Sequence, residues 1–171
     1  MRLLRFIIFI LVIFLFIFVI ALLLPSKVTV AKSVLIKASP QKIESQIVNF
    51  EQWKNWYPAF RDQNISLIKI PENTEKSSAI FKDQSGRKIS FKIVSADSQL
   101  IHIEVNSSNT AKVNYQFLIA PRLNDETQLT WNVNTDLGWY PWNRIQGIFL
   151  DKFSGIQYES ALENLKRSVE N

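Results

Sequence analysis

The stretch that decides the fold is DLGWYPWNRIQGIF, residues 136–149. Gly138 permits a sharp exit from a strand, and Pro141 presets the first turn of a helix. The large aromatic side chains beside Pro141 cannot all be buried in so tight a corner. We expect some of them to pack over the end of a sheet or against a second tryptophan pair, Trp53 and Trp56. The segment should therefore join the last strand to a long helix and form the lip of a hydrophobic cavity.

The residues after the corner predict one long amphipathic helix. Apolar side chains recur every three or four positions, first in one set and then, after a shift, in a second. This spacing gives a helix an apolar face, which we expect to cover the sheet. Gly147 and Gly155 fall inside this helix, where each is unfavourable by about 1 kcal/mol relative to alanine, so their missing side chains should leave room for a ligand or let the helix approach the sheet. The two sets are Trp142, Ile145, Phe149, Phe153 and Ile156, then Leu162, Leu165 and Val169.

The residues before the corner predict an antiparallel sheet. Runs of alternating apolar and polar residues are separated by turn-forming residues, a pattern typical of short strands joined in a meander. A further strand is expected over 28–38, followed by a short helix that begins at Ser39-Pro40 and a second helical piece over 51–57, ended by Pro58. The strands of the meander are expected near 64–70, 77–83, 87–95, 99–106, 111–120 and 126–137.

The alternation also predicts which side chains share a face. Residues two apart on a strand point to the same side of a sheet. One side of the meander is apolar, and the other carries charged and amide side chains. An apolar face needs a cover, so we predict an α+β fold with a hydrophobic cavity between the sheet and the C-terminal helix. The expected lining is Phe91, Ile103, Tyr115, Phe117, Trp131, Val133, Trp142, Ile145, Phe149 and Phe153.

The strand register argues against acid–base catalysis in this cavity. A general acid or base must lie close to the substrate, yet the titratable residues of these strands fall on the polar face. His102 is therefore expected on the surface, and only a one-residue slip in register would turn it and Glu104 inward. The chain has one histidine and no cysteine, so we predict neither a metal site nor a cofactor. No residue is assigned a catalytic role, although Tyr115 or Asp136 is the candidate if the protein is an enzyme.

An uninterrupted apolar run over 6–24 predicts a transmembrane helix. At about 1.5 Å per residue it spans about 28 Å, close to the roughly 30 Å of a bilayer core. The run is longer than the ~7–15 apolar residues of a signal peptide and lacks a small-x-small cleavage site. We therefore expect a single-pass anchor over 1–25 and one domain over 26–171. Arg2 and Arg5 precede the run, and Lys27 and Lys32 follow it, so the two sides differ little in positive charge. The arginines lie nearer the run, in a short tail that is simple to leave in the cytoplasm, which places the domain on the periplasmic or extracellular side, most simply of a bacterial inner membrane.

The charge of the domain argues against nucleic acid as a partner. The residues after Leu24 carry 18 basic and 15 acidic side chains, a net charge of +3. Nucleic-acid binding normally requires a clustered basic face. The expected partners are a hydrophobic small molecule or lipid, and the membrane through the N-terminal helix; the sequence assigns no protein partner.

Several motifs resemble one known family. They are Ser33–Pro40, Phe50–Pro58, Gly138–Arg144, Phe149–Phe153 and Leu162–Lys166. With the order of elements, they make the domain from Val28 onward resemble the helix-grip fold of the START-like superfamily, specifically the polyketide cyclase/dehydrase and lipid transport group, often labelled SRPBCC. The resemblance implies a deep apolar cavity, which different members use to carry lipids, bind hormones or pigments, or cyclise aromatic polyketides. It implies no shared catalytic residues.

Three functions remain open. The leading hypothesis is a membrane-anchored domain that binds a hydrophobic small molecule or lipid. The second is an enzyme of the cyclase or dehydratase type, in which an inward hydroxyl or carboxyl group guides a reactive substrate. The third is a ligand-free interaction module of an envelope complex, which a packed interior would favour.

Overall fold

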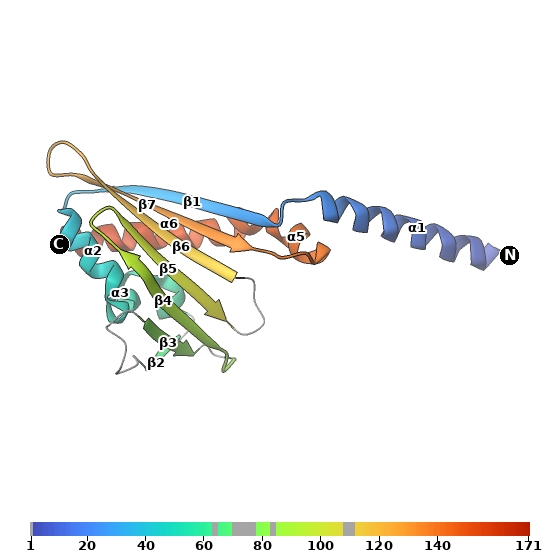
Figure 1. Cartoon of the computed structure of the whole chain (residues 1–171), viewed down its shortest axis with the longest axis horizontal. Coiled ribbons are helices and arrows are strands. Elements are labelled where there is room, and N and C mark those ends of the chain that lie inside the picture. The colour runs from blue at the N-terminus through green and yellow to red at the C-terminus, as the bar shows by residue number, and fades with distance from the viewer. Residues whose placement is uncertain (1, 63–64, 70–77, 83–84, 108–111) are drawn as a thin grey trace.

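The computed structural model describes residues 2–62, 65–69, 78–82, 85–107 and 112–171 (Figure 1). An N-terminal helix projects from an α+β domain, in which one sheet curves over a long C-terminal helix. The helices are α1 (Arg2–Leu23), α2 (Pro40–Val48), the 3₁₀ turn η1 (Phe50–Gln52), α3 (Trp53–Trp56), α4 (Pro58–Asp62), α5 (Pro141–Gly147) and α6 (Leu150–Glu170). The strands are β1 (Lys27–Ile36), β2 (Ser66–Lys69), β3 (Ser78–Lys82), β4 (Lys88–Ala96), β5 (Leu100–Ser107), β6 (Lys112–Pro121) and β7 (Thr127–Asp136).

The sheet is antiparallel throughout. In the part of the chain that the structure describes, seven strands pair in the order β1-β7-β6-β5-β4-β3-β2. Strands β2 to β7 form the predicted meander, and β1 extends it by pairing with β7, with Val30 opposite Val133. The β6–β7 turn passes through Asn124 and Asp125 at φ angles of 62° and 57°, a left-handed conformation that these residue types tolerate better than most. The predicted meander is thus confirmed, with β1 as its added edge.

Burial along the strands follows the predicted alternation. In β5, Ile101 and Ile103 are fully buried, whereas His102 between them is only partly covered. His102 pairs across the sheet with Gln116, so both side chains lie on the outer, polar face. The one-residue slip that would turn His102 inward does not occur.

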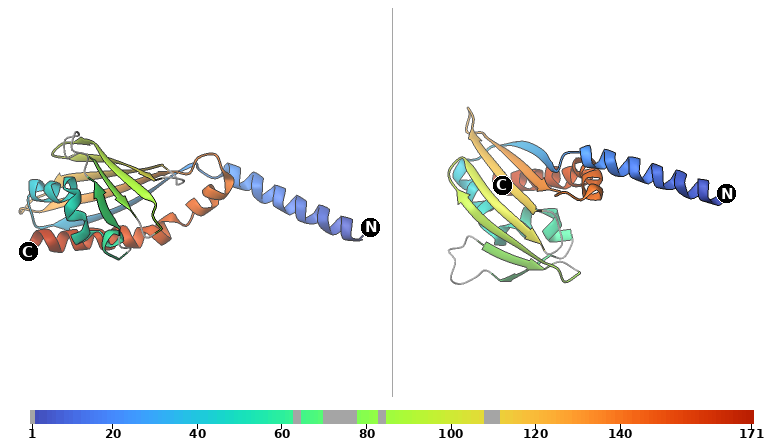
Figure 2. Two further views of the ribbon diagram at one scale, coloured as in Figure 1. Left: turned by 90° about the horizontal axis from the view of Figure 1, so that it is seen from below. Right: turned by 45° about the vertical axis from the view of Figure 1, so that its right-hand side comes forward.

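The inner face of the sheet is covered by α6 and by the short helices α2 to α4 (Figure 2). Helix α6 contributes Leu162, Leu165 and Val169, each at most 1 % exposed. Helix α3 contributes Trp53, which is fully buried and whose indole N–H donates to the Ile47 carbonyl at 2.8 Å. These contacts form the hydrophobic core of the domain.

The predicted single C-terminal helix is two helices. Helix α5 ends at Gly147, and α6 begins at Leu150. A Cβ atom at Gly147 would lie 2.3 Å from Leu137 Cδ1 and 3.2 Å from Val28 Cγ2. A larger residue would force the Leu137 side chain to move, so glycine suits the close packing of α5 on the ends of β1 and β7, before the chain changes direction into α6.

Gly155 has a similar role within α6. A Cβ atom there would lie 3.0 Å from Lys32 Cε and 2.7 Å from Asp151 Oδ1. These two side chains form an ion pair, with 3.2 Å between Lys32 Nζ and Asp151 Oδ1. Of the two explanations offered by the sequence, close packing of helix and sheet agrees better with the structure, because side chains of β1, Val28 and Lys32, lie beside the two glycines.

Helix α1 extends away from the domain but packs against it at its C-terminal end (Figure 1). Among the described residues, it is the helix long and apolar enough to cross a membrane, judged by length and composition. Arg144 of α5 donates from Nη1 to the carbonyls of Leu22 at 2.7 Å and Leu24 at 3.2 Å. The ring of Trp142 lies against Phe14, with 5.7 Å between centroids. Helix α5 is therefore the element that holds α1 to the domain.

Candidate functional site

The interior beneath β6 and β7 is filled by aromatic rings. Trp131 is fully buried and stacks on Phe117 with 4.9 Å between ring centroids. Tyr158 of α6 lies against the same indole at 4.9 Å, and Trp56 of α3 at 6.0 Å. Aromatic pairs at these distances pack favourably beyond their buried area. Side chains thus close this part of the cavity that the sequence predicted.

A pocket of about 260 Å³ opens beside this aromatic cluster. Its walls come from β4, β5 and β6, from the segment around α4, and from one residue of α6. The volume lies just below the ~300–1,000 Å³ usual for small-molecule sites, and the mixture of apolar walls with a few polar groups is typical of them. The lining residues are Tyr57, Ala59, Phe60, Ile65, Arg87, Ile89, Phe91, Val105, Ser107, Tyr115 and Gln157.

Tyrosine hydroxyls meet at the pocket wall. The Tyr57 and Tyr115 oxygens lie 3.4 Å apart, and the ring of Tyr158 packs beside that of Tyr115, with 6.4 Å between centroids. Burial raises the pKa of Tyr57, Tyr115 and Tyr158 above its usual value, because it penalises the charged phenolate. These groups are therefore neutral at physiological pH, and they serve as hydrogen-bond donors and acceptors rather than as bases.

The structure brings part of the predicted lining together. Phe91 and Tyr115 line the pocket. The remaining strand residues of the prediction are buried beside it in the aromatic core, with exposed fractions of 0 % for Ile103, Phe117 and Trp131 and 2 % for Val133. The strand register therefore identified the correct face, while the open volume lies toward one side of it.

The predicted lining residues after the corner do not face this interior. Phe149 and Phe153 are 45 % and 75 % exposed, so the predicted inward orientation is wrong. Trp142 and Ile145 are partly exposed, and Trp142 packs against Phe14 of α1 rather than against the core.

Helical phase explains the reversal. Helix α6 turns Gly155, Leu162 and Val169 toward the sheet. At about 100° per residue, Phe153 then lies on the opposite side of the helix. Because the sheet-facing residue at this level is a glycine, hydrophobicity alone points to the wrong face.

The corner is also not the lip of the pocket. Among the described residues, the pocket lining includes none between 136 and 149. The tryptophan pair expected to meet the corner is occupied elsewhere, since Trp56 packs against Trp131. The corner instead carries α5, which lies against α1.

The candidate acid and base groups lie outside the pocket. Asp136 Oδ1 accepts a hydrogen bond from the Gly138 N–H at 2.9 Å, so this carboxylate shapes the corner. His102 and Glu104 lie on the outer face of the sheet. Within the described ranges, no group of three or more His, Cys, Asp or Glu side chains could hold a metal ion. Of the titratable groups singled out in the sequence, Tyr115 is the one that reaches the pocket.

The wall formed around α4 was not predicted from the sequence. Helix α3 ends at Trp56, before Pro58 as predicted, but Pro58 is also the first residue of α4, in keeping with the preference of proline for that position. Phe60 continues the aromatic stripe of Trp53 and Trp56 and is 6 % exposed. This spacing of three or four residues was the signal that could have identified Phe60 and its neighbour Ala59.

Comparison with known proteins agrees with this architecture. A family model described as polyketide cyclase / dehydrase and lipid transport matches residues 27–170. A START superfamily protein from Mycobacterium smegmatis is 20 % identical, with a TM-score of 0.60 over 83 % of this chain and 97 % of that one. The Zhui aromatase/cyclase from Streptomyces sp. R1128 is 8 % identical, with a TM-score of 0.60 over 84 % of this chain and 94 % of that one. The protein XoxI from Bacillus cereus is 15 % identical, with a TM-score of 0.60 over 83 % and 95 %.

At these identities the solved structures show a shared fold alone. No curated protein gives a significant match. The family model, in contrast, spans every element from β1 to α6, and the sheet and long C-terminal helix form the helix-grip arrangement of that family. The chain therefore belongs to the polyketide cyclase/dehydrase and lipid transport family.

Proposed function

We propose that this protein is a membrane-anchored domain that binds a hydrophobic small molecule or lipid. The observation that carries the proposal is the pocket between the meander and α6, with its apolar walls and its buried tyrosine hydroxyls. A wall of this kind suits a ligand with an apolar body and one or two polar atoms. The volume of about 260 Å³ suits a small ring system or one segment of a longer chain.

The contacts of α1 support its role as a retained anchor. A signal sequence near an N-terminus passes the same test of length and composition as a membrane span. However, Ala21 is 1 % exposed, and Arg144 donates to the carbonyls of Leu22 and Leu24. Cleavage after α1 would remove these partners from α5, which favours an anchor that stays attached.

The test is native mass spectrometry of the full chain released from detergent, after incubation with an organic extract of bacterial membranes. We expect one apolar adduct per chain. Val105→Phe should abolish the adduct by filling the pocket, because Val105 lines it and is 8 % exposed. Ala59→Leu fills the same pocket from a partly exposed position on α4 and serves as a second variant if Val105→Phe does not fold.

The matched control is Val94→Phe, the same substitution in the neighbouring strand β4 at a side chain that is 50 % exposed. It should leave the adduct in place. An adduct that survives both pocket-filling variants would place the ligand elsewhere. A wild-type chain that takes up nothing from the extract would instead favour the ligand-free interaction module. The filled interior around Trp131 agrees with that function.

A second candidate is a dehydratase or cyclase, and the tyrosine hydroxyls are the observation that favours it. A neutral phenol can donate a hydrogen bond to a carbonyl or hydroxyl oxygen as that oxygen leaves or gains charge. The described lining of the pocket, however, contains no carboxylate or imidazole that could remove a proton. If Tyr115 assists the loss of water from a bound substrate, the Tyr115→Phe variant should bind the substrate without dehydrating it. Its adduct should then be heavier than the wild-type adduct by one water molecule. An unchanged adduct mass would favour binding alone.

A further inference from the structure

Large apolar side chains lie exposed at the corner and at the start of α6. In a soluble domain a patch of such residues marks an interaction site. Rings within the set pack on each other, with Trp139 and Tyr140 at 5.9 Å and Phe149 and Phe153 at 6.3 Å between centroids. We call this set the corner patch. Its exposed fractions are 73 % for Trp139, 47 % for Tyr140, 60 % for Ile148, 45 % for Phe149, 75 % for Phe153 and 67 % for Ile156.

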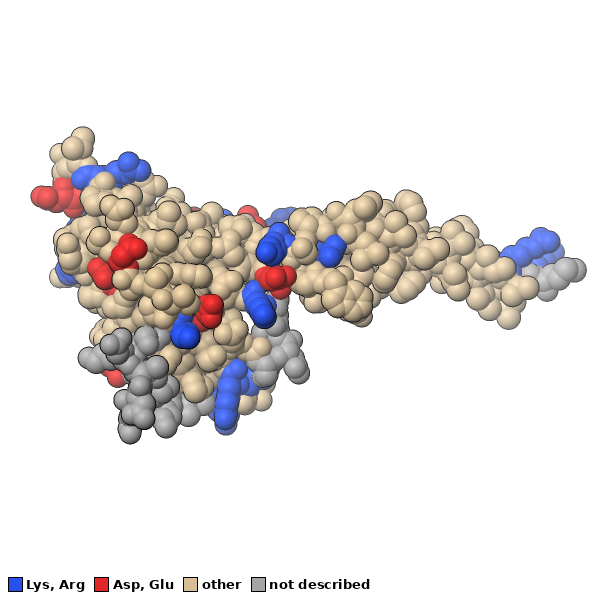
Figure 3. Space-filling view, viewed as in Figure 1, with Lys and Arg blue, Asp and Glu red and all other residues tan. Residues whose placement is uncertain are grey.

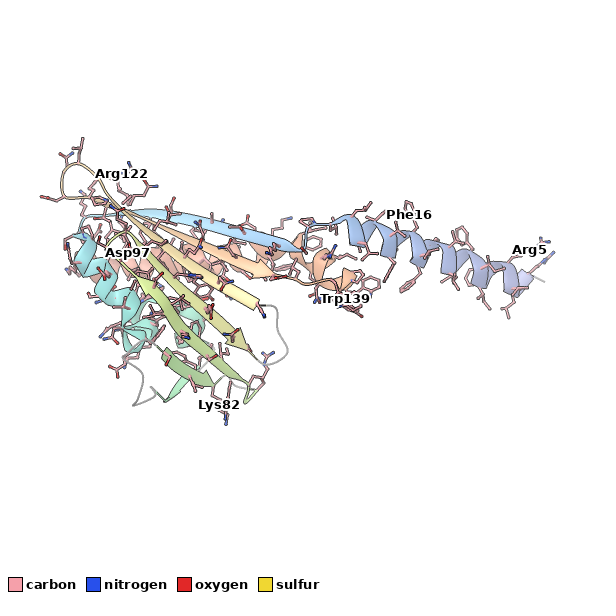
Figure 4. All side chains as sticks on the ribbon, in the orientation of Figure 1. Arg5, Phe16, Lys82, Asp97, Arg122 and Trp139 are labelled. Atoms are coloured by element: carbon pink, nitrogen blue, oxygen red, sulfur yellow. The ribbon has the colours of Figure 1, made fainter. Side chains whose placement is uncertain are left out.

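The corner overlaps the domain end of α1. The Trp142 ring lies 5.7 Å from that of Phe14. Phe14 is nine residues before Leu23, where α1 ends, a distance of about 14 Å along the helix axis. Trp139 lies beside the same end of α1, on the domain side of Phe16 (Figure 4). Helix α5 and its neighbours therefore run alongside the domain-side half of the apolar helix.

Arg144 fixes this overlap. Its guanidinium donates to the carbonyls of Leu22 and Leu24 and, from Nε, to the Gly138 carbonyl at 3.1 Å. The last carbonyls of a helix lack partners within the helix, and a cation stabilises that end. One side chain thus joins the end of α1 to the loop that carries Trp139.

We infer that residues 139–149 are immersed in the outer half of the bilayer beside α1, so that the domain sits on the membrane by two contacts rather than one. The inference rests on the proposed anchor. If the apolar run of α1 fills the hydrocarbon core, a ring in contact with Phe14 lies within that core as well. The lipid bilayer is then the partner that covers the part of the corner patch from Trp139 to Phe149.

The charges of this segment fit such a position. Between Asp136 and Asp151 the one charged residue is Arg144, and its guanidinium is bonded to carbonyl oxygens, as cations at membrane depth usually are. Tryptophan and tyrosine are enriched where a protein crosses the membrane interface. Figure 3 shows charged side chains at the two ends of α1 and a surface without them in between. Asp151, in its ion pair with Lys32, marks the level at which the chain returns to water.

This position would also orient the pocket. Arg87 precedes β4, and Ser107 ends β5; both line the pocket. These strand ends lie on the side of the domain from which α1 leaves (Figure 1). A corner held in the bilayer would therefore keep the pocket wall that contains Arg87 and Ser107 turned toward the membrane surface.

The absence of cysteine from the sequence allows a direct test with single-cysteine variants of the full chain. In the variants Trp139→Cys and Phe149→Cys, the introduced cysteine is labelled with a nitroxide spin label. Each labelled protein is then reconstituted in nanodiscs of phosphatidylethanolamine and phosphatidylglycerol. Electron paramagnetic resonance then compares collisions with oxygen, which concentrates in lipid, and with a water-soluble nickel chelate. Leu123→Cys is the matched control, an apolar residue 87 % exposed in the turn between β6 and β7. Val12→Cys reports on α1 itself.

We expect labels at 139 and 149 to favour oxygen, as at position 12, and the label at 123 to favour the nickel chelate. If 139 and 149 match 123 while 12 favours oxygen, the inference fails and the anchor stands. If position 12 also favours the chelate, the anchor itself fails. Spin–spin broadening at 149 that disappears on dilution with unlabelled chain would assign the corner patch to a second copy of the protein and overturn the inference.

Discussion

The pocket wall places the hydroxyls of Tyr57 and Tyr115 together and out of water, and the ring of Tyr158 packs beside that of Tyr115. Burial raises the pKa of each, chiefly because the phenolate would lose its hydration. The folded chain therefore keeps these protons at a pH at which the unfolded chain, with an ordinary tyrosine pKa of about 10, has lost them. The resulting stability is fully present below pH ~10 and is lost as the pH rises above that value.

Tyr115→Phe should make the chain less sensitive to alkali. Each of the buried phenols lowers the free energy of unfolding by up to about 1.4 kcal/mol per pH unit above pH ~10. Removing one hydroxyl should make the decline shallower, while costing about 1 kcal/mol at neutral pH through the lost hydrogen bond. The measurement is the thermal unfolding midpoint in detergent between pH ~8 and ~11. Tyr140→Phe, at a side chain 47 % exposed, is the control, and equal declines in both variants would contradict the argument.

At the scale of elements, α6 carries two apolar stripes on opposite sides. Leu162 and Leu165 belong to the stripe that faces the sheet and are at most 1 % exposed, whereas Phe153 and Ile156 belong to the other and are 75 % and 67 % exposed. Packing against the sheet explains the inner stripe but not the outer one. The outer stripe is confined to the turns nearest α5, where the corner patch lies.

The two stripes should differ in their effect on stability. Leu165→Ala should lower the free energy of unfolding by about 2–5 kcal/mol, because it leaves a cavity in the core. Ile156→Ser should change it by no more than about 0.5 kcal/mol, since the side chain it shortens has few contacts in the domain. Thermal unfolding in detergent compares the two. A large loss from Ile156→Ser would mean that the outer stripe packs within the chain.

The elements also show what could be predicted from the sequence and why. The strands were found to within a few residues, because period-two alternation is unambiguous where one face is polar. The same alternation placed Tyr115 inside and His102 outside. Which face of α6 turns toward the sheet could not be predicted, because both apolar stripes have helical spacing. At the level of Gly155 the sheet-facing position also has no side chain to mark it as apolar. The pocket depends on how α4 meets β4 and β5, a long-range contact that no local pattern records.

At the scale of the whole molecule, the proposed topology has the N-terminus in the cytoplasm and the domain outside. Arg2 and Arg5 lie at one end of α1, and positive charge next to a membrane span is retained on the cytoplasmic side. In intact spheroplasts expressing the full chain, a membrane-impermeant maleimide should therefore label Leu123→Cys without lysis. Leu3→Cys, at the other end of α1, should be labelled only after lysis. The reverse pattern would place the domain in the cytoplasm.

The join between α1 and β1 has a consequence for how the protein can work. Leu24, Pro25 and Ser26 separate the two elements, a tether that reaches at most about 10 Å. Even these residues are held, since the Leu137 N–H donates to the Ser26 carbonyl at 2.8 Å. A protein that carries a ligand from one membrane to another needs a long flexible linker to its anchor, and the link between α1 and β1 is short and held. If the proposed function is correct, the binding domain stays at the surface of one membrane. Any molecule that delivers the ligand to it or takes the ligand from it must therefore come to that membrane.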